Sequence, residues 1–248
     1  MDVTNPGQFF ACCGLLEAAH RLWPGAEGWF EGQYFHVACD NAEAEDPLSE
    51  LIEQVTQCTA EVIPFGGDDA KIAPIRVGPP LDLELDWWLF VRTSPTPFKT
   101  WAANASSLQM YTKWIKPLQT AQKHISSDTS QVFEVSTPIQ GSYGFDSSVG
   151  WNALDVGFSL NEHASLKRLP LRPAVELFGA IGLQRFLPAL RARQEEIDYC
   201  VWRMPLMAQP AAAVVRGVVT TSFSTRFRCR FVKRGTFKGL STSTSIGE

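Results

Sequence analysis

A run of arginines that alternates with apolar residues is the segment best suited to binding chemistry. Between Phe223 and Phe231 the chain places Arg226, Arg228 and Arg230 two residues apart. Successive side chains of a β-strand point to opposite faces, so the arginines share one face, about 6.6 Å apart at a rise of about 3.3 Å per residue. A guanidinium group fits phosphate through paired hydrogen bonds. The pattern therefore predicts a phosphate-binding strand whose apolar face packs on the core.

Further basic residues extend the predicted nucleic-acid-binding surface. After the arginine strand they are Lys233, Arg234 and Lys238, and earlier in the sequence they are Lys99, Lys113 and Lys116. The aromatic residue Trp101, close to Lys99, is a further candidate for this surface. Loss of each phosphate contact lowers the salt slope of duplex binding by about 0.9, so replacing all three arginines by Ala is expected to remove roughly 2–3 units. The alternative is that the arginine strand is simply a solvated outer face.

Residues that could serve hydrolysis are present, but their spacing forms no recognisable catalytic motif. The four histidines lie at 20, 36, 124 and 163, and none belongs to an HExxH or HxxH pattern. Asp68 and Asp69 follow two glycines without the GK[ST] ending of a P-loop, which favours a turn over a nucleotide site. We expect no catalytic residues, metal site or cofactor. A nucleotide or RNA hydrolase using Asp146, Asp155 or His163 remains the alternative.

The six cysteines indicate reduced thiols rather than a disulfide framework or a zinc site. They are scattered through 248 residues without a CxxC pair, and Cys12 and Cys13 are neighbours in an apolar segment. No apolar run approaches the ~18 residues of a membrane span, and the first residues lack the basic start of a signal peptide. We therefore expect a cytoplasmic protein without a membrane association.

Charge is distributed unevenly along the chain. Residues 1–98 contain 16 acidic and 4 basic side chains, whereas residues 99–248 contain 10 acidic and 18 basic ones, which gives the net charge of −4. No acidic residue lies between Tyr199 and Gly247. A chain polarised in this way can offer a basic face to phosphates and an acidic face to a protein neighbour. The two halves could equally neutralise each other within one fold.

The elements that must position these residues predict an α+β fold with helices and antiparallel strands around one central buried helix. Asn5-Pro6 followed by Gln8 is a helix start, and apolar spacing continues to Trp23. The segment 172–187 is apolar nearly all round, with Gly179 and Gly182 allowing close approach, which is typical of a buried helix. Strands and helices do not alternate strictly, so we expect one α+β domain over residues 1–248.

The rest of the sequence predicts further helices and short strands. It predicts a hairpin over 28–37, helices over 47–61, 99–124 and 208–216, and strands over 72–78, 83–91, 131–140 and 197–204, followed by a final strand pair. The helix over 99–124 is expected to bend or break at Pro117.

Four segments resemble the small large-subunit family of type I-U (also called I-G) CRISPR systems. They are residues 5–17 (NPGQFFACCGLLE), 98–102 (FKTWA), 145–159 with WNALDVGFS, and 172–186 (RPAVELFGAIGLQRF). The arginine strand followed by Phe237-Lys238-Gly239 is also similar to the end of that family's sequences. The chain is short for a large subunit, and its acidic first 98 residues depart from what a DNA clamp would show.

The resemblance implies a non-catalytic subunit of a Cascade-type surveillance complex. Its expected partners are other CRISPR effector subunits, CRISPR RNA and target DNA, together with the nuclease-helicase that such complexes recruit. The acidic half would then face protein and the basic half nucleic acid. A purely structural adaptor, whose basic strand pairs with an acidic protein, is a further alternative.

Overall fold

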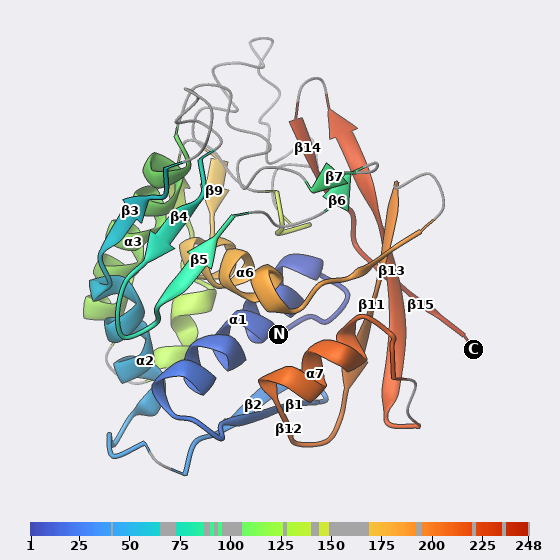
Figure 1. The fold of residues 1–248 in the computed structure, drawn as a ribbon, viewed down its shortest axis with the longest axis horizontal. Helices are drawn as coiled ribbons and strands as arrows, with labels where there is room; N and C mark the ends of the chain where they lie inside the picture. The colour runs from blue at the N-terminus through green and yellow to red at the C-terminus, as the bar shows by residue number, and fades with distance from the viewer. Residues whose placement is uncertain are drawn as a thin grey trace.

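The computed structural model describes residues 1–40, 42–64, 73–86, 90–91, 94–95, 106–125, 128–139, 144–148, 169–191, 195–219, 222–234 and 237–247. Within these ranges the chain combines helices with antiparallel strands, which confirms the predicted α+β class (Figure 1). Two helices cross in the centre of the molecule, and the sheets lie on either side of them. The helices are α1 (Pro6–Leu22), α2 (Pro47–Gln57), α3 (Ser107–His124), α6 (Pro173–Arg185), α7 (Ala208–Val215) and the 3-10 helix η1 (Thr129–Phe133).

The largest sheet contains the arginine strand. Its order is β10 (Ala189–Leu190), β11 (Glu196–Trp202), β13 (Ser224–Arg234) and β14 (Phe237–Leu240), and β15 (Thr244–Ile246) also pairs with β13. Every pairing is antiparallel. Strand β13 is central in the sheet, because β11 pairs with its residues 224–230, while β15 pairs with residues 226–228 and β14 with residues 231–234.

Smaller sheets complete the described fold. The hairpin of β1 (Glu27–Glu31) and β2 (Tyr34–Ala38) confirms the predicted hairpin, and β12 (Leu206–Met207) adds to its β1 edge. The others are the sheet of β3 (Ala60–Val62), β4 (Ile75–Val77) and β5 (Leu83–Leu85), the pair β6 (Phe90–Val91) with β7 (Ser94–Pro95), and the pair β8 (Thr137–Ile139) with β9 (Leu169–Leu171).

The two central helices approach each other closely because glycines lie at their crossing. A Cβ atom on Gly14 of α1 would lie 1.9 Å from the carbonyl oxygen of Phe178, and one on Gly182 of α6 would lie 2.2 Å from the carbonyl oxygen of Phe10. Residues 173–183 of α6 are all buried. The segment 172–187 is therefore the central buried helix that the sequence predicts, and its glycines are required by backbone contact rather than by flexibility.

The core continues from this crossing into the large sheet. The ring of Phe9 stacks on Tyr199 with centroids 4.3 Å apart, and Phe9 also meets Trp202 edge to face. The Trp202 indole donates a 2.6 Å hydrogen bond to the carbonyl of Gly28 in the hairpin. One apolar cluster extends from Phe9 to Leu240, so the acidic and basic halves of the sequence share a core.

Several predicted elements differ in extent. Residues 129–133 form the 3-10 helix η1 instead of the predicted strand, because Asp128 caps a turn there, and only 137–139 form a strand. The helix predicted to reach Glu61 ends at Gln57, and 60–62 pair with β4 instead. Helix α3 starts at Ser107, where Ser106 and Gln109 form a capping box, and it continues through Pro117 to His124.

The structure also bears on the sequence expectations about the cysteines and about membrane spans. All six cysteines are free, and Cys12, Cys13, Cys200 and Cys229 are buried among apolar side chains. Burial raises the pKa of the Cys12 thiol well above its ordinary value, which disfavours the nucleophilic thiolate. Among the described residues, no helix has both the length and the apolar character needed to span a membrane.

Candidate nucleic-acid interface

The arginines of β13 do share one face, as their spacing predicts, but two of them have carboxylate partners. Antiparallel pairing sets Glu196 of β11 opposite Arg230 and Asp198 opposite Arg228. Arg228 donates two hydrogen bonds to Asp198, from Nε to Oδ1 at 2.7 Å and from Nη2 to Oδ2 at 3.0 Å. The neighbouring strand β11 therefore supplies an anion to Arg228, although no acidic residue lies near it along the sequence of β13.

The ion pairs continue in both directions along the sheet. Arg191, just after β10, donates from Nε to the Oδ2 atom of Asp198 at 2.5 Å. At the other end Arg230 donates from Nε to Glu196 at 2.8 Å, and Arg228 lies 3.7 Å from the same carboxylate. Arginines and carboxylates thus alternate in the order Arg191, Asp198, Arg228, Glu196, Arg230. We refer to these five side chains as the arginine ladder.

The ladder carries more positive than negative charge, and its cations reach solvent. The carboxylate of Asp198 is only 2% exposed, whereas the side chain of Arg230 is 74% exposed. Three arginines face two carboxylates, so one positive charge remains. The geometry fixes the guanidinium planes while their outward N–H groups remain available, which is the arrangement that phosphate binding requires.

Arg226 adds a second uncompensated charge beside the ladder. Its cross-strand neighbour on β11 is Cys200 rather than a carboxylate, and no ion pair joins it to another residue of the described ranges. A Cβ on Gly217 would lie 3.3 Å from its Nη2 atom, so the guanidinium packs against the turn that follows α7. Of the three predicted arginines, Arg226 is the one whose charge has no partner in the described structure.

The pKa of Asp198 reflects the surrounding arginines. Burial alone would raise this pKa, but hydrogen bonds from Arg228 and Arg191 and the attraction of their charges outweigh burial and lower it below its ordinary value. Asp198 therefore remains ionised at neutral pH. It orients the two guanidinium groups and is not available as a proton donor.

The other predicted binding residues do not all join this face. Lys233, Arg234 and Lys238 belong to β13 and β14, where Lys233 pairs with Lys238 in register, and their side chains lie outside the described structure. Lys99 and Trp101 lie outside the described residues altogether. Lys113 and Lys116 lie on α3, on the opposite side of the molecule from β13 (Figure 1). There they line a groove of about 850 Å³ with Pro117 and Val135.

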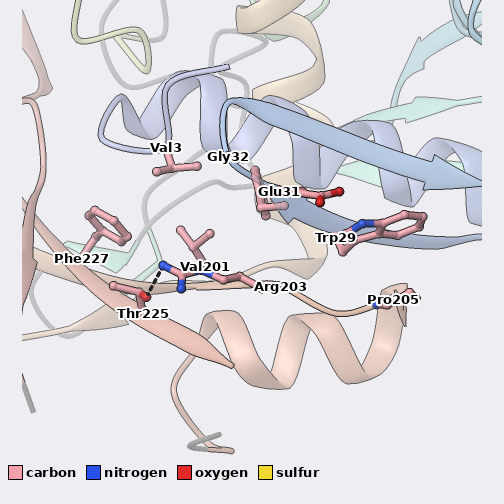
Figure 2. Close-up of a pocket in the computed structure, with 10 residues that line it drawn as sticks. Val3, Trp29, Glu31, Gly32, Val201, Arg203, Pro205, Thr225 and Phe227 are labelled. Atoms are coloured by element: carbon pink, nitrogen blue, oxygen red, sulfur yellow. Dashed lines mark hydrogen bonds between the residues drawn. The ribbon is translucent and has the colours of Figure 1, made fainter. Parts of the chain in front are cut away.

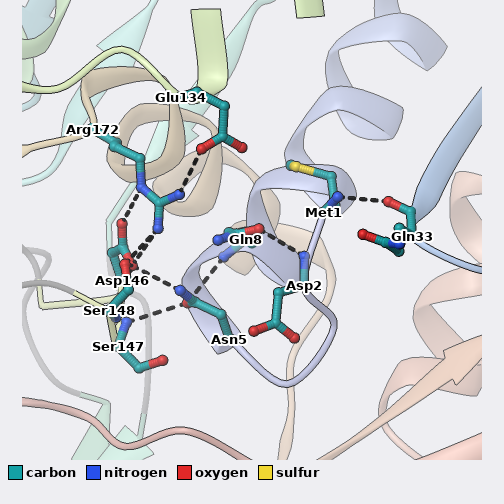
Figure 3. A network of polar contacts seen from close by, with 10 residues as sticks. All are labelled: Met1, Asp2, Asn5, Gln8, Gln33, Glu134, Asp146, Ser147, Ser148 and Arg172. Atoms are coloured by element: carbon teal, nitrogen blue, oxygen red, sulfur yellow. Dashed lines mark hydrogen bonds and ion pairs between the residues drawn. The ribbon is translucent and has the colours of Figure 1, made fainter. Parts of the chain in front are cut away.

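Asp146, a candidate for hydrolysis, is instead the centre of a buried structural cluster (Figure 3). Arg172 donates to both of its oxygens, from Nε at 2.7 Å and from Nη2 at 2.9 Å, and Asn5 and Ser148 also donate to it. Burial would raise the pKa of Asp146, but the Arg172 interactions and the other hydrogen bonds lower it. With both oxygens bonded and its side chain only 1% exposed, this carboxylate is not placed to activate water.

The cluster also explains how the first helix is positioned. The Asn5 side chain caps α1 by accepting from the backbone N–H groups of Gly7 and Gln8, and it accepts from Ser147 as well. The Gln8 side chain, which follows this cap, accepts a hydrogen bond from the backbone N–H of Asp2 at 2.7 Å. The residues 144–148 are thereby held against the helix start.

The remaining residues considered for hydrolysis or for a metal site do not belong to the described part of the chain. Asp155, His163, Asp68 and Asp69 lie outside the described residues. Among the residues that the structure does describe, no three His, Cys, Asp or Glu side chains are grouped as metal ligands would be.

Sequence reasoning missed Glu196, Asp198 and Arg191 because it considered charge along the chain only. The available signal was the spacing of Glu196 and Asp198, which alternate with apolar residues as the arginines of β13 do. Comparisons with protein-family models, with curated proteins and with solved structures found no match.

Proposed function

We propose that this chain is a non-catalytic, nucleic-acid-binding subunit of a CRISPR effector complex in the cytoplasm. The observation that carries the nucleic-acid part is the excess positive charge on the exposed face of β13, in the arginine ladder and Arg226. The ladder fixes several guanidinium groups on a regular strand spacing, which suits a phosphate backbone better than a single carboxylate. The resemblance over residues 5–17 and 172–186 supports the assignment to such a complex.

The phosphate contacts would position a nucleic acid without reading its sequence. Arginines on one strand face are spaced for successive phosphates, and such contacts set register and orientation rather than specificity. CRISPR RNA and target DNA are the expected ligands, and guide pairing would supply the sequence recognition. In that role the subunit supports target recognition and recruitment of the nuclease-helicase and performs no cleavage.

The test of this assignment is co-purification with the products of the neighbouring genes, followed by sequencing of any bound small RNA. We expect CRISPR RNA in the particle and subunits of an effector complex beside this chain. An isolated monomer that binds no nucleic acid and only an acidic protein would support the structural adaptor instead.

The absence of catalysis has its own experiment. We expect the purified chain with Mg²⁺, Mn²⁺ or Zn²⁺ to leave single-stranded and double-stranded DNA and RNA intact. Cleavage that is lost in Asp155→Ala or His163→Ala would establish the hydrolase instead. Asp146→Ala is a poor probe of catalysis, because removing this carboxylate would leave the buried side of Arg172 unpaired.

The acidic half is the proposed contact with protein neighbours. Charge reversal at Glu43, Glu45 and Asp46 is expected to weaken assembly more at low salt than at high salt. Asp46 also caps α2 through Ser49 and accepts a hydrogen bond from Thr129. The exposed pair Glu43→Lys and Glu45→Lys is therefore the cleaner variant. Unchanged assembly at every salt concentration would remove this segment from the interface.

A further inference from the structure

A cleft lies on the other face of the large sheet from the arginine ladder. Its volume is about 500 Å³, and it opens where the β1–β2 hairpin meets the ends of β11 and β13 (Figure 2). Thr225 and Phe227, which alternate with the ladder arginines along β13, line it together with Val201. The cleft is therefore distinct from the arginine ladder, and its volume is within the range of small-molecule sites.

One side of the cleft carries a positioned cation. Arg203 continues from β11, where its backbone N–H donates to the carbonyl of Phe223 at 3.1 Å. Its Nη2 atom donates to the hydroxyl of Thr225 at 3.2 Å, and Figure 2 shows the guanidinium turned toward that residue. The side chain is exposed, and no ion pair with a described carboxylate neutralises it. The remaining N–H groups are available to an anion.

The hairpin side of the cleft carries an aromatic ring and an acceptor. Trp29 stacks on its cross-strand partner His36, with centroids 5.1 Å apart and an interplanar angle of 14°, so one indole face is held in place. The Glu31 side chain is 76% exposed, and Figure 2 shows it beside Trp29, whereas Arg203 lies across the cleft. The Oε2 atom of Glu31 lies 3.5 Å from Nε2 of His36.

We propose that this cleft binds one unpaired nucleotide of a single-stranded nucleic acid. The inference rests on the proposed function, since it assigns a base-binding site to the same subunit. The base would stack beside Trp29, its phosphate would bind Arg203, and an exocyclic amine of the base would donate to Glu31. All bases have a flat π face, so stacking accepts any of them, while a carboxylate favours the bases that carry an exocyclic amine, cytosine, adenine and guanine, over thymine and uracil.

The charges of the two sides fix the orientation of the ligand. Glu31 repels phosphate and Arg203 attracts it, so the backbone lies on the β13 side and the base edge on the hairpin side. A base within a duplex is already stacked and paired and does not enter the cleft. The site therefore distinguishes single strands from duplexes, which the phosphate contacts of the arginine ladder do not.

The experiment measures binding of fluorescein-labelled cytosine-only and thymine-only single strands, as DNA and as RNA, over a range of salt concentrations. We expect Trp29→Ala to weaken binding roughly 5- to 100-fold, which is the cost of one lost base stack. Arg203→Ala should lower the single-strand salt slope by about 0.7, and Arg203→Lys should restore it.

Glu31→Gln should reduce the preference for cytosine over thymine. Equal preference in the wild-type chain would contradict the role of Glu31.

The control is Arg76→Ala, which removes an exposed arginine on β4, and thermal unfolding establishes that each variant is folded. If the cleft variants bind single strands as the wild type does while ladder variants lose salt dependence, the cleft inference is wrong and the proposed function stands. If the wild-type chain binds no nucleic acid, both are wrong. Tight binding of free cytidine monophosphate without binding of the strand would assign a mononucleotide site and overturn the inference.

Discussion

The Asp146 cluster and the arginine ladder use the same guanidinium–carboxylate chemistry for different ends. In the cluster, Arg172 is 11% exposed and pairs with the Asp146 carboxylate, which is 1% exposed, and its Nη1 atom also donates to Glu134 at 3.3 Å. In the ladder, arginines outnumber carboxylates and Arg230 is 74% exposed. An arginine is structural where its charge is matched and buried, and it is available to a ligand where charge is left over at the surface.

The energetic consequences differ in the same way. Breaking a buried ion pair leaves an uncompensated charge and is strongly destabilising, whereas an exposed pair contributes little to stability. We therefore expect cluster variants to affect folding and ladder variants to affect binding. The following predictions test that division, beginning with the largest expected effect.

Arg172→Ala should lower the free energy of unfolding by about 3–5 kcal/mol, because the buried Asp146 would lose its cation. Urea unfolding measures this change. The matched control is Arg76→Ala, whose exposed pair with Glu84 should contribute little to stability. A loss below 1 kcal/mol in Arg172→Ala would mean that the cluster is not the structural site described here.

Acid should destabilise the chain through the buried carboxylates. Glu17 of α1, whose side chain is 1% exposed, pairs with Arg21 and Arg185. The pKa values of Asp146, Asp198 and Glu17 are lowered in the folded state, so the unfolded state takes up protons first as the pH falls. The stability they provide is therefore present above the ordinary carboxyl pKa of about 4 and is lost as the pH falls through the folded values. Unfolding free energy measured between pH 7 and 2 should fall below about pH 4, and stability that rises in acid would contradict this assignment.

Glu196→Gln should strengthen nucleic-acid binding modestly. Removing this charge frees Arg230, and the salt slope of duplex binding should rise by up to about 0.9. Salt titrations of binding measure the slope, with Glu61→Gln, an exposed carboxylate on β3, as the control. Weaker binding in Glu196→Gln would indicate that Glu196 orients Arg230 for the ligand rather than competing with it.

Local sequence patterns predicted which segments form helices and strands, but they did not predict which elements pack against each other. Helix α1 followed from the Asn5-Pro6 start, and the buried helix α6 followed from a uniformly apolar segment. The crossing of α6 with α1 was not predicted, because the pattern of one segment does not show which helix it packs against. The short 3-10 turn at 129–133 was missed because apolar residues such as Val132 and Phe133 fit a strand equally well.

The ladder could not be predicted from local pattern alone. Its ion pairs depend on the register of β11 against β13, which are separated by the whole of α7 and its loops. Asp146 posed the same difficulty, because its partner Arg172 lies 26 residues away. In both sites the sequence shows which side chains are charged, and only tertiary pairing shows which charges remain available.

Salt titration of duplex DNA binding by the double variant Arg226→Ala/Arg230→Ala tests the central claim most directly. This variant keeps the Arg228–Asp198 pair, so the buried carboxylate is not left without a cation. We predict a salt slope lower by about 1.8, or about 0.9 for each arginine, with a similar loss across DNA sequences. A folded double variant whose salt slope equals that of the wild type would show that the face of β13 is merely solvated.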